Sequence, residues 1–328
     1  MSAADATSPQ ALVHHTVQVP ATSANLGAGF DAFGLALDLH LAARTVARDP
    51  DGPRVTSSGL GAEVLPTDDT NLVWRAFRDA CAALDVQVPD VALEVTNRIP
   101  LERGLGSSSA AIVAGIVLAR SVTGARVGEP ALVELAASME GHPDNVAPAI
   151  LGGLVAGARG ETGFVVRRID PLPGQVALAF VPPAAQSTDA SRTTLPATLP
   201  REDVVDQVAR AGHMLVGLTG AWTIDPTLVG DRLHEPVRTA ALPDRGALLE
   251  ALRSDGMRAW LSGSGPVVIA LVPEGDRRAQ DAAAERADAA GSELLVLRLD
   301  RLGALACPDG GCALSGVGGC AQCPRERL

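Results

Sequence analysis

A glycine- and serine-rich turn lies between a strand pattern and a strongly apolar helix pattern in the first half of the chain. Residues 91–97 alternate in polarity, Gly104, Leu105 and Gly106 follow, and Ser107, Ser108 and Ser109 open a helix expected over 107–122. Glycines let a backbone approach an anion, and the first amides and the dipole of a helix favour negative charge. The pattern predicts an anion-binding loop, and an ordinary capped helix after a turn is the alternative.

Composition removes several kinds of anion site and of covalent chemistry. All 27 basic residues are arginine, and the sequence contains no lysine and no tyrosine. A Walker lysine, a protein-kinase lysine and a Schiff-base lysine are therefore excluded. The net charge of −11 argues against a nucleic-acid partner.

No apolar run is long enough to cross a membrane, since the longest one, residues 110–119, falls short of the roughly 20 residues required. The first residues lack the pattern of a signal peptide. We therefore expect no membrane contact and a cytoplasmic location.

The hydrophobic pattern predicts an α+β fold with two domains. Strands are expected over 12–19, 33–43, 91–97, 152–158, 164–169, 176–181, 267–272 and 293–299, and helices over 71–84, 107–122, 130–139, 202–218, 245–254 and 277–290. The predicted division is a disordered lead (1–11), an N-terminal domain (12–165), a C-terminal domain (166–302) and a cysteine- and glycine-rich tail (303–328).

Polar side chains are unusually dense directly after the helix expected over 130–139. That helix carries Glu134 and breaks at Gly141, and His142, Asp144 and Asn145 follow before a new apolar run. A turn that caps the next helix would account for one of these side chains but not for all three. The density favours a binding or catalytic site.

Two further segments are rich in glycine and small residues. Residues 20–34 read PATSANLGAGFDAFG and hold Asn25 and Asp31, whose carboxylate could bind an ammonium or hydroxyl group. Residues 260–266, WLSGSGP, place a glycine turn before a buried strand. Taken singly, each segment is ambiguous. Asp31 could serve only for hydrogen bonding within the loop, and residues 260–266 could be only a tight connection.

In this order, the four segments resemble the motifs of the GHMP small-molecule kinase family, over roughly residues 12–300. Asn145 stands where mevalonate-type members have a catalytic aspartate, and together with Asn25, Asp31 and the GHPDN segment it points to the homoserine kinase branch. The resemblance implies an N-terminal ribosomal-protein-S5-domain-2-like ATP-binding domain and a C-terminal ferredoxin-like α+β domain. It also implies ATP and Mg²⁺ as cofactors, phosphorylation of the side-chain hydroxyl of L-homoserine in threonine biosynthesis, and a homodimer.

The resemblance also assigns roles to residues. Asn145, Glu134 and Asp31 would be catalytic, and Ser108 and Glu134 would bind Mg²⁺. The homoserine ligands would be Asn25, Asp31, His142, Arg192 and Arg238, with the two guanidinium groups on the substrate carboxylate. The nucleotide ligands would be Pro100, Arg103, Gly104, Leu105, Gly106, Ser107, Ser108 and Ser109.

Two features depart from the family pattern. Glu102 precedes the loop where a small residue is usual, and its carboxylate would repel a triphosphate unless it points away or pairs with Arg98 or Arg103. The tail holds Cys307, Cys312, Cys320 and Cys323, which are consistent with a structural zinc site or with a disordered tail. These departures leave open a non-catalytic ligand sensor of the same fold. A kinase for another small alcohol is a second alternative, because the sequence does not give the shape of the pocket.

Overall fold

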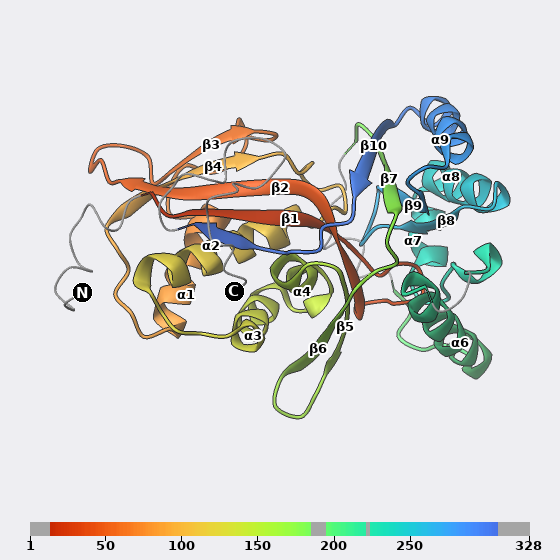
Figure 1. Ribbon diagram of the computed structural model, residues 1–328, viewed down its shortest axis with the longest axis horizontal. Coiled ribbons are helices and arrows are strands. Elements are labelled where there is room, and N and C mark those ends of the chain that lie inside the picture. Colours follow the sequence, from red (N-terminus) through yellow and green to blue (C-terminus); the bar gives the residue numbers. More distant parts are fainter. Residues whose placement is uncertain (1–13, 185–194, 221–223, 308–328) are drawn as a thin grey trace.

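The computed structural model describes residues 14–184, 195–220 and 224–307, and these form two β-sheets with helices packed on each (Figure 1). Residues 16–169, together with a short strand at 305–307, supply the strands of the larger sheet, and residues 175–298 supply those of the smaller one. The predicted two-domain α+β plan is confirmed. None of the helices in these residues is both long and apolar enough to cross a membrane.

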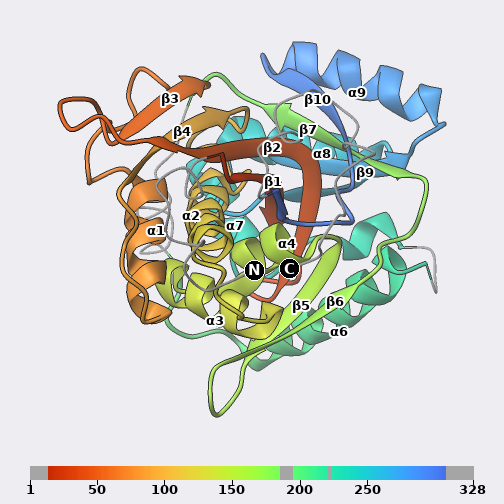
Figure 2. The same cartoon turned by 60° about the vertical axis from the view of Figure 1, so that its left-hand side comes forward.

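The larger sheet has seven strands, in the order β11-β1-β2-β4-β3, with β5 pairing to β2 and β6 to β5. Its strands are β1 (Thr16–Ala24), β2 (Phe33–Ala47), β3 (Val55–Gly59), β4 (Val91–Asn97), β5 (Leu154–Arg159), β6 (Phe164–Ile169) and β11 (Leu305–Cys307). Its helices are α1 (Leu72–Ala83), α2 (Ser107–Thr123), α3 (Glu129–Glu140) and α4 (Pro143–Leu151). Figures 1 and 2 show α1 to α4 on the same side of the sheet.

The central helix α2 is apolar around most of its circumference because it packs against α1, α3, α4 and the sheet. Gly115 lets α1 approach closely, since a Cβ at this position would lie 2.4 Å from the carbonyl oxygen of Val73. The Asn71 side chain accepts a hydrogen bond from the Val73 amide and so caps α1. These contacts hold the beginning of α2, and with it the glycine loop, in a fixed place.

The smaller sheet is antiparallel, in the order β10-β7-β9-β8. Its strands are β7 (Gln175–Val181), β8 (Arg258–Leu261), β9 (Val268–Pro273) and β10 (Glu293–Arg298). The helices of this half are α6 (Arg201–Leu218), the 3₁₀ turn η3 (Pro226–Leu228), α7 (Glu235–Ala241), α8 (Pro243–Ser254) and α9 (Arg277–Ala289). The series β7, α8, β8, β9, α9, β10 is the ferredoxin-like arrangement that the resemblance implies.

The structure divides the chain somewhat differently from the sequence-based boundaries. Residue 165 lies inside β6, which pairs with β5 of the larger sheet, so the chain passes to the smaller sheet only between Ile169 and Gln175. Leu305–Cys307, expected in the tail, forms β11 and pairs with β1. Residues 1–13 and 308–328, and with them Cys312, Cys320 and Cys323, lie outside the described residues.

The two sheets share one continuous hydrophobic core at their junction. Buried Trp260 on β8 donates from Nε1 to Ser23 Oγ on β1 over 3.0 Å, and Ser262 Oγ donates to the same hydroxyl over 2.9 Å. The WLSGSGP segment is therefore fixed against the end of β1. The candidate site lies at this junction.

Candidate active site

The glycine loop has a backbone that only glycine accommodates at two positions. Gly106 caps α2 with a φ of 67°, and a Cβ there would lie 2.0 Å from Thr22 Oγ1. Gly104 has a φ of 83°, and a Cβ there would lie 2.3 Å from the carbonyl oxygen of Ser262. The loop is thus packed closely against β1 on one side and against the 262–265 turn on the other.

A cavity of about 1370 Å³ opens in front of the loop. Every predicted nucleotide ligand except buried Leu105 lines it: Pro100, Arg103, Gly104, Gly106, Ser107, Ser108 and Ser109. Glu140, His142, Asn145, Gly263 and Ser264 line the same cavity. The structure therefore brings the loop, the polar turn after α3 and the 262–265 turn to one cavity.

Asn145 lies beside the glycine loop, at the beginning of α4. Its Oδ1 accepts a hydrogen bond of 2.9 Å from the Thr22 hydroxyl, and Thr22 N donates to the Leu105 carbonyl over 3.1 Å. Because Oδ1 is occupied by Thr22, the Asn145 amide group is left to donate hydrogen bonds. Thr22 belongs to the small-residue segment, but nothing in the sequence distinguished it from its neighbours.

Polar residues of the GHPDN and 20–34 segments lie next to one another, and His142 among them lines the cavity. Ligand atoms of Asp31, His142 and Asp144 lie within 4.8 Å of one another, and His142 Nδ1 contacts Asp144 Oδ1. Asn25 Oδ1 accepts from the Asp31 amide over 3.0 Å, which stabilises the positive φ of 53° at Asp31. The structure thus gathers three of the predicted substrate ligands with Asp144.

Asn25 and a fourth predicted substrate ligand, Arg238, converge on one carbonyl. Asn25 Nδ2 donates to Gly263 O over 2.8 Å, and Arg238 Nη1 donates to the same oxygen over 2.9 Å. Both side chains belong to residues only 3 % exposed, beneath the turn that lines the cavity. Arg238 itself is not among the described residues that line the cavity. Arg192 lies outside the described residues.

The acidic residue at the loop serines differs from the one that the resemblance assigns. Glu140 Oε1 accepts from Ser109 Oγ over 2.7 Å and from Ser108 Oγ over 3.3 Å. Glu134 Oε2 instead accepts from the Phe164 amide over 2.7 Å, at the turn between β5 and β6. The described arrangement therefore does not bring Glu134 to Ser108, and it places a carboxylate there that the sequence analysis did not single out.

Two charged residues, Glu102 and Arg103, precede the loop, and both line the cavity. The Arg103 guanidinium donates to the carbonyl oxygens of Leu101, Pro182 and Pro183, and so holds the loop to the end of β7. Glu102 is exposed, with a φ of 52°. The beginning of α2 favours an anion at the loop, and the Glu102 carboxylate adds negative charge to the same cavity.

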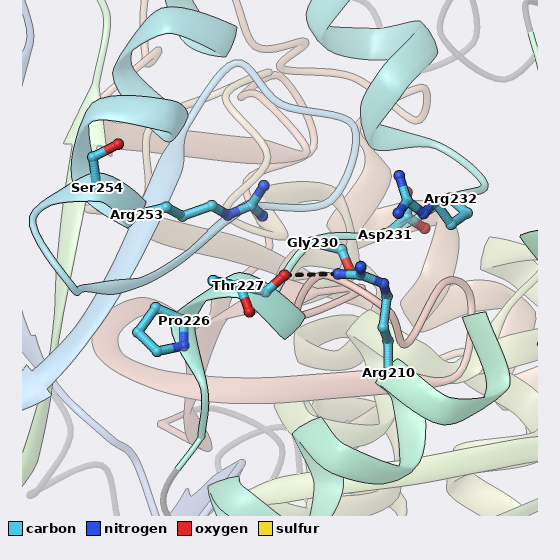
Figure 3. A pocket seen from close by; sticks show the side chains of 8 residues that line it. All are labelled: Arg210, Pro226, Thr227, Gly230, Asp231, Arg232, Arg253 and Ser254. Carbon is cyan, nitrogen blue, oxygen red and sulfur yellow. Dashed lines mark hydrogen bonds between the residues drawn. The ribbon is translucent and has the colours of Figure 1, made fainter. Parts of the chain in front are cut away.

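A second, smaller hollow of about 430 Å³ is lined by residues of α6, η3, the 230–232 segment and α8 (Figure 3). Three arginines line it, but each has an acidic partner: Arg210 and Arg232 pair with Asp206, and Arg253 pairs with Glu235. The hollow shares no lining residue with the large cavity.

Comparisons with known proteins agree with this geometry. Residues 71–153 match the GHMP kinases N terminal domain, and residues 224–292 match the GHMP kinases C terminal domain. A homoserine kinase of Clavibacter michiganensis is 41 % identical over 274 residues, covering 82 % of this chain and 87 % of the relative. One from Streptomyces avermitilis is 43 % identical over 262 residues, covering 79 % and 85 %.

The fold is similar to those of solved small-molecule kinases. The homoserine kinase of Cytophaga hutchinsonii aligns with a TM-score of 0.75 at 25 % identity, over 90 % of this chain and 98 % of that one. The mevalonate kinase of L. major aligns with a TM-score of 0.62 at 14 % identity, over 85 % and 94 %, which shows a shared fold only. The chain belongs to the GHMP kinase family. Within this family of ATP-dependent enzymes, it belongs to the homoserine kinases.

Proposed function

We propose that the protein transfers the γ-phosphoryl group of ATP to the side-chain hydroxyl of L-homoserine, as a step of threonine biosynthesis. The observation that carries the proposal is the position of Asn145. Its side chain lines the cavity next to the glycine loop, and Thr22 leaves its amide group as the donor. A donor beside a phosphate site can orient an attacking hydroxyl, whereas an aspartate would act as a base.

The glycine loop would hold the triphosphate without lysine. Gly104 and Gly106 have positive φ values and let the loop pack against the 262–265 turn and β1, and the first amides of α2 would be available to an anion there. Ser107 and Ser108 line the cavity and add hydroxyl donors. The loop would therefore supply most of the positive potential that the phosphates need.

In the transfer, the homoserine hydroxyl oxygen forms a bond to the γ-phosphorus while the bond from that phosphorus to the bridging oxygen breaks. ADP leaves with the electron pair, and the hydroxyl proton passes to the transferred phosphoryl group or to water. Because the transition state is loose, the proton is lost late and a strong base contributes little. Asn145 would act by positioning the hydroxyl oxygen.

The oxygen donors at the loop fit Mg²⁺, which prefers hydroxyl and carboxylate ligands. We propose Ser108 and a carboxylate of α3 as the protein ligands. Glu140 is already hydrogen-bonded to Ser108, whereas Glu134, the residue that the resemblance assigns, would first have to leave the Phe164 amide. When bound, the cation neutralises charge on the phosphates.

The amino-acid end of homoserine would lie toward Asp31, His142 and Asn25. The Asp31 carboxylate suits the substrate ammonium, and Arg238 and Arg192 suit its carboxylate. Since Arg238 now donates to Gly263 O, a substrate carboxylate would compete with that carbonyl for the guanidinium. We also propose a cytoplasmic location and a homodimer. Light scattering on the purified protein would test the homodimer.

The test is the initial rate of ADP release with MgATP and L-homoserine, L-serine, L-threonine or mevalonate, in the wild type and in Asp31→Ala. Selective turnover of homoserine that collapses in Asp31→Ala is the expected result. Equal turnover of mevalonate would redirect the proposal to another alcohol. A folded protein that turns over none of the four would support the sensor alternative.

A further inference from the structure

His234 is completely buried at the beginning of α7, between the substrate segment and Arg238. Its Nε2 lies 3.2 Å from the carbonyl oxygen of Gly27, and its Nδ1 lies 3.1 Å from Arg238 Nη1. Its ring stacks on Phe30, with the ring centroids 5.2 Å apart. One imidazole thus touches both the segment that carries Asn25 and Asp31 and the arginine proposed for the substrate carboxylate.

The partners of this ring fix its protonation state. A guanidinium can only donate, so Nδ1 must be the unprotonated, accepting nitrogen. A carbonyl can only accept, so Nε2 must carry the hydrogen. A neutral imidazole with its hydrogen on Nε2 is the single form that satisfies both contacts.

The charges around the ring are consistent with that form. Burial lowers the pKa of His234, and burial also raises the pKa of neighbouring Asp231. Asp231 Oδ1 accepts from the amides of Leu233, His234 and Glu235, at 3.1, 2.8 and 2.7 Å, and so fixes the first turn of α7. Asp231 Oδ2 lies 3.5 Å from Nε2 and reinforces the donor role of that nitrogen.

We infer that His234 is a positioning residue for substrate recognition, which holds the Arg238 guanidinium and the 25–31 segment in register through its two ring nitrogens. The inference rests on the proposed function, since it assigns a partner to a proposed substrate ligand. Arg238 Nη1 is held from two sides, by His234 Nδ1 and by Gly263 O. If the carboxylate of homoserine displaces the carbonyl, the imidazole keeps the guanidinium in place, and less side-chain entropy is lost on binding.

The two amide substitutions of His234 separate its two contacts. In His234→Asn, the side-chain oxygen can take the place of Nδ1 as acceptor for Arg238. In His234→Gln, the amide reaches the place of Nε2 and can donate to Gly27, but the acceptor for Arg238 is lost. Thr239→Ala is the matched control, because Thr239 lies on the same helix and donates only to the backbone carbonyls of Glu235 and Pro236.

The experiment measures KM for homoserine, KM for MgATP, kcat and ADP affinity in these variants, in Arg238→Gln and in the double variant His234→Gln/Arg238→Gln. His234→Gln should raise KM for homoserine roughly 10- to 100-fold, the loss expected for one hydrogen bond to a charged group. ADP affinity should stay unchanged. His234→Asn should recover part of the loss, and the double variant should be no worse than Arg238→Gln alone.

Other outcomes overturn the inference in distinguishable ways. Additive effects in the double variant, or a loss of ADP affinity and homoserine binding together, would mean that His234 supports the fold generally. An unchanged KM in His234→Gln, with a raised KM in Arg238→Gln, would defeat the inference and leave the proposed function intact. If the wild type does not phosphorylate homoserine, or Arg238→Gln binds it normally, the proposed function or its carboxylate site fails, and the inference fails with it.

Discussion

Gly106→Ala should disable phosphoryl transfer far more than it destabilises the protein. At a φ of 67°, an alanine costs about 1–2 kcal/mol of backbone strain. Its Cβ would also lie 2.0 Å from Thr22 Oγ1, so the two atoms must separate by about 1.4 Å to reach an ordinary contact distance. That movement breaks the hydrogen bond that orients Asn145, and a misplacement of about 1 Å at reacting groups can lower the rate about 100-fold.

The same helix offers a matched control at its other end. Gly124 also has a φ of 67°, but a Cβ there meets nothing within 4 Å. Gly124→Ala should therefore show the strain alone, as a small loss of melting temperature with normal kinetics. The assay is kcat/KM for homoserine and for MgATP beside thermal melting by circular dichroism. If Gly106→Ala and Gly124→Ala have equal kinetics, the reasoning about the loop and Thr22 is refuted.

Four further predictions each concern one side chain. Glu140→Gln should weaken the apparent Mg²⁺ affinity 10- to 100-fold, because the amide has no charge beside Ser108. Glu134→Gln should chiefly lower the melting temperature, because it weakens the contact with the Phe164 amide. Titration of the rate with Mg²⁺ tests the first prediction, and melting curves test the second. Asn145→Ala should lower kcat with little change in KM for MgATP, since its proposed role is to orient the hydroxyl, and steady-state kinetics test this. Burial raises the pKa of the Cys81 thiol to about 11, so the folded state favours the protonated thiol. The contribution of this thiol to stability should be complete below the unfolded pKa of about 9 and should be lost between pH 9 and 11. Thermal melts of the wild type and of Cys81→Ala across this pH range measure the difference.

Each of these predictions has an opposite result. A weakened apparent Mg²⁺ affinity in Glu134→Gln but not in Glu140→Gln would mean that α3 rearranges when nucleotide binds. The Mg²⁺ ligand would then be Glu134, as the resemblance implies. A raised KM for MgATP with normal kcat in Asn145→Ala would place Asn145 on the nucleotide. Identical pH profiles in the Cys81 variant and the wild type would contradict the shifted thiol.

Local signals in the sequence were enough to predict the elements that carry the loop. The apolar spacing of residues 71–84 matches α1, the serines open α2, and the alternation of residues 91–97 matches β4. Each signal depends on neighbouring residues, so it can be read without the fold. The order of the four motifs then pointed to the family.

The missed elements are short or depend on distant partners. The four residues of β8 and the three of β11 become strands only because β9 and β1 pair with them. The helix α4 contains Pro143 and Pro148, which weaken a helical pattern in sequence. Such elements are determined by tertiary contacts.

The site was less predictable than the fold for a geometric reason. Glu134 and Glu140 are six residues apart on α3, which turns them about 120° apart around the helix, and no periodicity says which one faces the loop. The distance from Thr22 to Asn145 spans 123 positions in the sequence. The burial of Arg238 beneath Gly263 likewise depends on how the two sheets meet.

The most direct test of the account is the rate of ADP release with MgATP and L-homoserine in the wild type, in Asn145→Ala and in Gly106→Ala. The account predicts turnover that requires homoserine and falls by about two orders of magnitude in Gly106→Ala, with a reduced kcat in Asn145→Ala. Turnover that is unchanged in both variants, or that does not depend on homoserine, would contradict it.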